Sequence, residues 1–134
     1  MAGNPSHPPR VLIVEDEFLI CDLLAEVLSD RGFEVHAVSN AKDALQHLTG
    51  GNPCDVLFTD INLPGGLDGE ALAELARQLR PNLPVVYASG SVGRIEHFKA
   101  VSGASFLPKP YDLEKVCCML ERYAARTNWR AEVS

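Results

Sequence analysis

The chain has 134 residues, of which 46% are hydrophobic and 22% charged, and this predicts one compact globular domain with no second domain. Its net charge of -6 and pI of about 5.1 argue against direct binding to nucleic acid or to an anionic membrane surface. No apolar run approaches the roughly 20 residues needed to cross a bilayer, and the four cysteines show no CxxC spacing. We therefore predict a cytoplasmic protein with reduced thiols.

The first segment, residues 1–9, contains three prolines and lacks the basic and apolar regions of a signal peptide, so we predict a disordered leader. Residues 11–14 are a run of apolar, mostly β-branched residues, which is typical of a strand covered on both faces. Apolar residues then recur at helical spacing from Phe18 to Arg31, and Gly32 stands where a helix C-cap would lie. A strand and a helix thus open a domain that we expect to span residues 10–126.

The second and third predicted strands differ in character. Residues 34–38 alternate between polar and apolar side chains, as a half-exposed edge strand does, and Asn40 can cap a helix over 41–49. Residues 55–60 form an apolar run that ends abruptly in the carboxylate of Asp60, before a glycine-rich loop. Because ligands bind at the carboxyl ends of strands in open α/β sheets, Asp60 is the first candidate functional residue.

The second half of the chain continues the alternation of helix and strand. Asp68 can cap a helix that ends before Pro81, and residues 84–88 predict a fourth buried strand that runs into a Ser-Gly-Ser segment. A weaker helix is expected over about 93–101, because this stretch has few apolar anchors. It should be the helix that is easiest to displace.

A short fifth strand is predicted over 104–107, and Asp112 can cap the last helix, with a frayed tail over 127–134. Five strand and helix units in strict alternation require parallel strands with right-handed crossovers. We therefore predict an α/β fold: a flavodoxin-like, doubly wound (βα)5 domain with a five-stranded parallel sheet of order 2-1-3-4-5. In that order the ends of the first and third strands lie on either side of the topological switch point.

This topology brings the carboxylates of Glu15, Asp16 and Asp60 together at one sheet edge. They repel one another and cannot all stay ionised near neutral pH unless a cation joins them, and Mg²⁺ (or Mn²⁺) suits such oxygen ligands. The fourth and fifth strands end in Ser89 and Lys109. A hydroxyl and an ammonium group around a carboxylate suit a phosphoryl group, with Asp60 as the nucleophile that forms an aspartyl phosphate. A solvated acidic loop and a solvated lysine are the alternative interpretation.

Four motifs carry this chemistry: Val-Leu-Ile-Val-Glu-Asp-Glu at 11–17, Asp60 with Pro64 and Gly69, Ser89-Gly90, and Leu-Pro-Lys-Pro at 107–110. In combination they resemble the receiver domain of bacterial two-component response regulators, over about residues 10–126. By this resemblance the domain would take a phosphoryl group from a histidine kinase.

The resemblance implies a role for each of these residues. Asp60 would be the phosphoacceptor, Asp16 a direct metal ligand, and Glu15 an acidic partner that holds the metal through water. Ser89 and Lys109 would each bind a phosphoryl oxygen, and Ser89 would also act in the switch together with Phe106. The other implied features are the backbone carbonyl of Asn62 as a metal ligand, a cis bond between Lys109 and Pro110, and Phe106 at the position of the switch aromatic.

The sequence departs from the family pattern in three places. The loop over 64–69 is one residue longer than usual, which makes the geometry near Asn62 harder to predict. Phe106 stands where a tyrosine is often found, so it cannot report phosphorylation by a hydrogen bond. The Tyr-Ala-Ser-Gly sequence at 87–90 is similar to a subset of receivers, many of them stand-alone proteins with unusual histidine kinases. Ordinary core packing is the alternative interpretation of both Tyr87 and Phe106.

We therefore expect a stand-alone receiver of a phosphorelay that signals by protein contact. Its partners would be a histidine kinase or phosphotransfer protein, and a downstream protein bound by the face of helix 93–101, strand 104–107 and the last helix. Phosphorylation could also produce a homodimer. It would catalyse only its own phosphorylation and dephosphorylation.

Two alternatives from other classes stay open on the sequence alone. An aspartate-nucleophile, Mg²⁺-dependent phosphatase generally needs a second carboxylate two residues after the nucleophile, and here that residue is Asn62. A binding module that works without phosphorylation would not need the intact set of acidic residues, Ser89 and Lys109.

Overall fold

The computed structural model describes residues 7–90 and 98–133 of the chain. Five parallel strands form one sheet in the order β2-β1-β3-β4-β5, as predicted. The strands are β1 (Arg10–Val14), β2 (Glu34–Val38), β3 (Val56–Asp60), β4 (Val85–Ser89) and β5 (Ser105–Pro108). Strand β3 lies at the centre of the sheet and is buried along its whole length, whereas β2 is a largely exposed edge strand.

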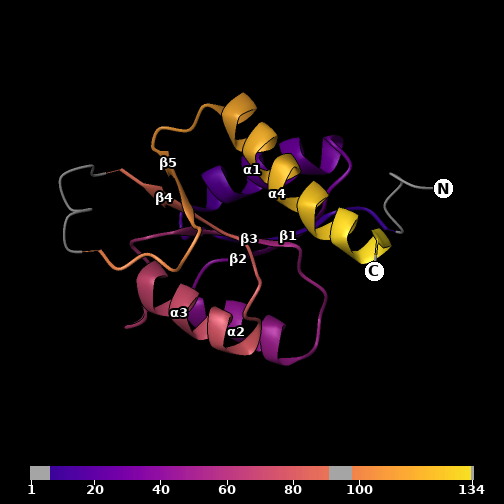
Figure 1. Cartoon of the computed structure of the whole chain (residues 1–134). Helices are drawn as coiled ribbons and strands as arrows, with labels where there is room; N and C mark the ends of the chain where they lie inside the picture. The colour runs from indigo at the N-terminus through magenta and orange to yellow at the C-terminus, as the bar shows by residue number, and fades with distance from the viewer. Residues whose placement is uncertain (1–6, 91–97, 134) are drawn as a thin grey trace.

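Helices cover both faces of this sheet (Figure 1). On one face lie α1 (Phe18–Asp30) and α4 (Leu113–Val133), and on the other lie α2 (Ala41–Thr49) and α3 (Gly69–Leu79). Because side chains alternate along a strand, each strand contributes to both layers of core: Ile13 and Phe58 pack towards α1 and α4, and Leu12 and Leu57 towards α2 and α3.

Side-chain caps begin three of the helices, and all three were predicted. The Asn40 side chain accepts a hydrogen bond from the Asp43 amide at 2.8 Å, and Asp68 accepts one from Ala71 at 2.9 Å. Asp112 accepts hydrogen bonds from the amides of residues 114 and 115 at the start of α4. Each cap satisfies backbone donors that have no partner within the helix.

Helix α4 is longer than we predicted, because it continues to Val133 through the stretch expected to be a frayed tail. Residues 127–133 contain neither glycine nor proline, so no residue there forces the helix to stop. The weaker helix expected over 93–101 falls mainly on residues 91–97, outside the described part, and residues 98–101 are not helical. In the part of the chain that the structure describes, no helix is long and apolar enough to cross a membrane.

Candidate functional site

The carboxyl edge of the sheet gathers three carboxylates, those of Glu15, Asp16 and Asp60. Val14, the last residue of β1, pairs with Thr59 of β3. The residues that follow them, Glu15 and Asp60, therefore lie side by side. One oxygen from each of the three carboxylates lies within 4.8 Å of the others. Glu15 is 2% exposed and Asp60 6%, whereas Asp16 is open to solvent. The predicted convergence of these three residues is confirmed.

A single cation, Lys109, lies between the two buried carboxylates. Its Nζ is 2.7 Å from Oδ2 of Asp60 and 3.0 Å from Oε1 of Glu15, and the side chain is 17% exposed. Burial by itself disfavours the charged lysine, but its hydrogen bonds to Asp60 and Glu15 outweigh burial and raise the pKa of Lys109 above its ordinary value. Lys109 is therefore positively charged at neutral pH and serves as the counter-ion of the two buried carboxylates.

The end of β5 holds Lys109 in this position. The Lys109 amide donates a hydrogen bond to the carbonyl of Ser89 at 2.9 Å, which places the lysine beside the end of β4. Ser89 is itself buried and pairs with Pro108 across the sheet. The peptide bond between Lys109 and Pro110 is cis, as the resemblance implies.

Backbone amides orient the two buried carboxylates. Oδ1 of Asp60 accepts a hydrogen bond from the Asn62 amide at 3.1 Å, and Oε2 of Glu15 accepts one from the Glu17 amide at the same distance. Asn62 thus contacts Asp60 through its N–H, and a metal-binding role for its carbonyl stays a prediction. Both carboxylates have one oxygen tied to the backbone and the other to a side chain.

Gly69, the first residue of α3, lies so close to Asp60 that no side chain fits there. A Cβ at this position would lie 2.2 Å from the carbonyl oxygen of Asp60 and 2.8 Å from Cα of Ile61. The Gly69 amide also donates to the Ile61 carbonyl at 2.7 Å. The glycine therefore lets the start of α3 support the backbone of the nucleophile candidate.

Tyr111 belongs to this site and escaped sequence reasoning. Its hydroxyl donates a hydrogen bond to Oε1 of Glu15 at 3.1 Å, and Nζ of Lys109 lies 5.7 Å from its ring centroid. Its ring packs edge-on against Phe58. Burial, followed by the charge of Glu15, raises the pKa of Tyr111 well above its ordinary value. The available signal was a hydroxyl-bearing aromatic residue two positions after Lys109.

Phe106, which was predicted to act in the switch together with Ser89, lies within β5 next to Tyr87 of β4. Phe106 is half-buried, and its ring stacks on Tyr87 with centroids 5.2 Å apart. Tyr87 is fully buried, and its hydroxyl accepts a hydrogen bond from the Val101 amide at 3.1 Å. Both rings therefore pack in the core, and a switch role for Phe106 stays a prediction. The Tyr87 hydroxyl also ties β4 to the segment that precedes β5.

The donor set at the carboxyl edge fits a hard divalent cation. Glu15, Asp16 and Asp60 offer only oxygen ligands, which Mg²⁺ and Mn²⁺ prefer. Lys109 balances one of the three negative charges, so two remain to be neutralised. Among the side chains that the structure describes, within residues 7–90 and 98–125, no other group of three potential metal ligands lies together in this way.

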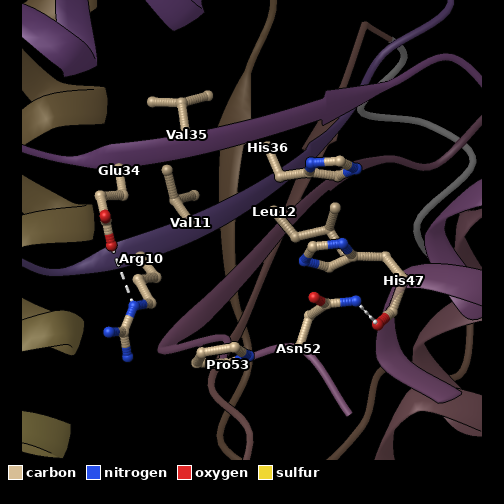
Figure 2. A pocket seen from close by; sticks show the side chains of 9 residues that line it. All are labelled: Arg10, Val11, Leu12, Glu34, Val35, His36, His47, Asn52 and Pro53. Atoms are coloured by element: carbon tan, nitrogen blue, oxygen red, sulfur yellow. Dashed lines mark hydrogen bonds and ion pairs between the residues drawn. The ribbon is translucent and has the colours of Figure 1, made fainter. Parts of the chain in front are cut away.

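The opposite, amino edge of the sheet holds a second hollow of different chemistry (Figure 2). It lies below β1 and β2, where the rings of His36 and His47 stack with centroids 3.9 Å apart. Asn52 donates a hydrogen bond to the His47 carbonyl at 2.9 Å. Burial, and after it the neighbouring His36 and Arg80, lower the pKa of His47. The two imidazole rings stack face to face and do not direct their nitrogens at one point. This hollow therefore does not offer a set of converging ligands like the carboxylates of the carboxyl edge.

Comparison with known proteins finds a family model and curated relatives that match most of the chain. Residues 11–121 match the family model described as the response regulator receiver domain. The nitrogen assimilation regulatory protein NtrX of Azorhizobium caulinodans is 35% identical over 127 residues, which is 92% of this chain and 28% of that protein. The DNA-binding transcriptional regulator NtrC of Escherichia coli K12 is 32% identical over 84% of this chain and 24% of its own length. This chain thus spans about a quarter of these curated relatives.

Solved structures agree with the fold at the level of the whole domain. A response regulator receiver protein from Sinorhizobium medicae superposes with a TM-score of 0.82 at 28% identity, over 90% of this chain and 97% of that one. The receiver domain of the hybrid histidine kinase CckA gives a TM-score of 0.74 at 31% identity, over 86% and 98% of the two chains. Both neighbours are therefore matched over nearly their full length.

Proposed function

The chain belongs to the response regulator receiver family, and on that premise we propose that it accepts a phosphoryl group from a histidine kinase or phosphotransfer protein on Asp60. The observation that carries this proposal is the setting of Asp60: a buried carboxylate between Glu15, Asp16 and the ammonium of Lys109. Receiver domains bind Mg²⁺ through acidic residues, and we propose that this one requires Mg²⁺ or Mn²⁺.

Asp60 is the proposed nucleophile. A carboxylate oxygen attacks the phosphorus of a phosphohistidine, and the phosphorus–nitrogen bond breaks as the phosphorus–oxygen bond forms. Lys109, which pairs with Asp60 at 2.7 Å, then moves to a phosphoryl oxygen, and the Ser89 hydroxyl donates to another. Transfer of this kind needs mainly positioning and neutralisation of charge.

The divalent cation is proposed to be held by the carboxylates of Asp16 and Asp60, by Glu15 through water, and by the backbone carbonyl of Asn62. When bound, it supplies positive charge that neutralises the phosphoryl oxygens. Glu15 and Asp60 are already oriented for this by the amides of Glu17 and Asn62.

We propose that the phosphorylated domain acts in the cytoplasm as a member of a phosphorelay, through contact with another protein. The face formed by β5, α4 and residues 98–104 would bind the target, and phosphorylation could also produce a homodimer. Direct contact with nucleic acid is not part of the proposal, because the chain carries a net charge of -6. The domain would catalyse only its own phosphorylation and dephosphorylation, without turnover of other phosphoesters.

Labelling with acetyl phosphate and Mg²⁺ tests the assignment of Asp60. Wild-type protein should be phosphorylated, Asp60→Asn should not, and removal of the metal with EDTA should abolish labelling. Asp30→Asn is the matched control, because Asp30 is an exposed aspartate at the end of α1 and its loss removes the same charge. Labelling that survives in Asp60→Asn would refute the assignment.

A further inference from the structure

Glu15 is a buried carboxylate whose two oxygens are held by three donors. Oε2 accepts a hydrogen bond from the Glu17 amide at 3.1 Å. Oε1 accepts one from the Tyr111 hydroxyl at 3.1 Å and lies 3.0 Å from Nζ of Lys109. Because Glu15 is 2% exposed, water supplies little of the solvation that a free carboxylate would have. The orientation of Glu15 therefore depends on these three protein donors.

Lys109 is the least permanent of the three donors. It is shared between two carboxylates and is closer to Asp60, at 2.7 Å, than to Glu15. In the proposed reaction it moves to a phosphoryl oxygen and can no longer serve Glu15 in the same way. A buried charge that loses a donor is costly, so a second donor on the same oxygen keeps Glu15 oriented.

Tyr111 is the second donor on this oxygen, and its ring is held in place by packing. Its ring lies edge-on to Phe58 of the central strand β3, with centroids 5.6 Å apart and planes at 62°. It also packs against the core layer beneath α1 and α4. A ring fixed on two sides directs its hydroxyl at one place, and here that place is Oε1 of Glu15.

We propose that Tyr111 is a positioning residue that holds Glu15 towards the acidic cluster and so sets how tightly the cluster binds a divalent cation. This inference rests on the proposed function, because it gives Glu15 a role in holding Mg²⁺. Groups that orient metal-binding residues commonly change metal affinity by about 10- to 100-fold when they are lost.

The test is the affinity of the full chain for Mg²⁺, measured by NMR titration without any phosphoryl donor. Tyr111→Phe removes one hydroxyl and keeps the ring against Phe58, and we expect Mg²⁺ binding to weaken on the order of 10-fold. Tyr123→Phe is the matched control, because it removes the same hydroxyl from a tyrosine that contacts Ser105 and the carbonyl of Gly103. Equal Mg²⁺ affinity in wild-type protein and Tyr111→Phe would overturn the inference.

A double-mutant cycle separates positioning from general support of the fold. If Tyr111 acts through Glu15, adding Tyr111→Phe to Glu15→Gln should change Mg²⁺ affinity less than it does in wild-type protein. An equal loss in both backgrounds would contradict a role through Glu15. Thermal unfolding without Mg²⁺ identifies the folded fraction of each variant, so the affinities refer to folded protein.

The outcome for Tyr111 is distinguishable from the outcome for Asp60. Wild-type protein that is labelled on Asp60, with Tyr111→Phe binding Mg²⁺ normally, would refute the role of Tyr111 alone. Wild-type protein that fails to bind Mg²⁺ at all would refute both.

Discussion

Two equally buried aspartates lie at the two ends of the central strand, and they have different hydrogen-bond partners. Asp55 precedes β3 and Asp60 ends it, and each is 6% exposed. Oδ2 of Asp55 accepts a hydrogen bond from the Arg10 amide at 2.8 Å, and its own amide donates to the Arg10 carbonyl at 2.8 Å. Asp55 thus ties the beginning of β3 to the beginning of β1.

Asp60 has partners of another kind. Its Oδ2 is paired with the ammonium at the end of the long Lys109 side chain, and two further carboxylates lie next to it. A backbone amide in a sheet is fixed in place, whereas a lysine side chain can turn to a new partner. Burial of a carboxylate therefore does not by itself indicate a reactive site. The features that distinguish Asp60 from Asp55 are the neighbouring carboxylates and the side-chain cation that can change partner.

The largest expected contrast comes from the same substitution at both ends of β3. Asp60→Asn should abolish labelling by acetyl phosphate and leave the fold intact, because the asparagine oxygen can keep the hydrogen bond from the Asn62 amide and Lys109 keeps its pair with Glu15. Asp55→Asn should keep labelling and lower the free energy of unfolding by about 1–3 kcal/mol, because a buried charged acceptor is lost. Urea unfolding and labelling are measured on both variants. The comparison fails if Asp55→Asn loses labelling while it stays folded.

A methyl group at Gly69 should damage the carboxyl end of β3 alone. In Gly69→Ala the new Cβ would overlap the Asp60 carbonyl oxygen, so the backbone of one of them must shift. Overpacking of this kind costs about 1–3 kcal/mol, and we also expect slower labelling. Gly90→Ala is the control for stability alone, since a Cβ there meets nothing closer than 3.8 Å. Unchanged stability and labelling in Gly69→Ala would show that the close approach does not matter.

The smallest effect concerns the amino edge, through the pH dependence of stability. Burial lowers the pKa of folded His47 below its ordinary value of 6.5, and the stacked His36 and Arg80 add to this. Below about pH 6.5 the unfolded chain therefore binds more protons at this position, so the His47 contribution to stability should fall as pH drops from 6.5. It should be constant at higher pH.

His47→Gln isolates that contribution at the amino edge. Free energies of unfolding measured between pH 5 and 7.5 should rise more steeply with pH in wild-type protein than in this variant. Identical slopes in the two proteins would contradict a lowered pKa. The labelling rate should not change in His47→Gln, because the ring lines the hollow at the amino ends of β1 and β2, whereas Asp60 lies at the carboxyl end of β3.

Local sequence rules were sufficient for the sheet order and for the place of Asp60. Alternation of strands and helices fixes parallel pairing, and an apolar run ending in a carboxylate locates the functional edge. The helix caps at Asn40, Asp68 and Asp112 were predictable because a cap depends on residues only two or three positions away.

Long-range features were beyond such rules. The hydrogen bond between Tyr111 and Glu15 joins residues 96 positions apart, and the tie between Asp55 and Arg10 depends on the register of β1 and β3. The predicted end of α4 was wrong because residues 127–133 were taken for a tail. This stretch contains neither glycine nor proline, so the sequence carries no signal that would end the helix there.

The most direct test of the central claim is chemical location of the phosphoryl group. Protein treated with acetyl phosphate and Mg²⁺ is reduced with borohydride, which converts an aspartyl phosphate into homoserine, and its peptides are read by mass spectrometry. We predict homoserine at position 60 only, formed only with Mg²⁺, with Asp16 and Asp55 intact. Homoserine at position 16 or 55, or labelled protein that yields none, would contradict the account.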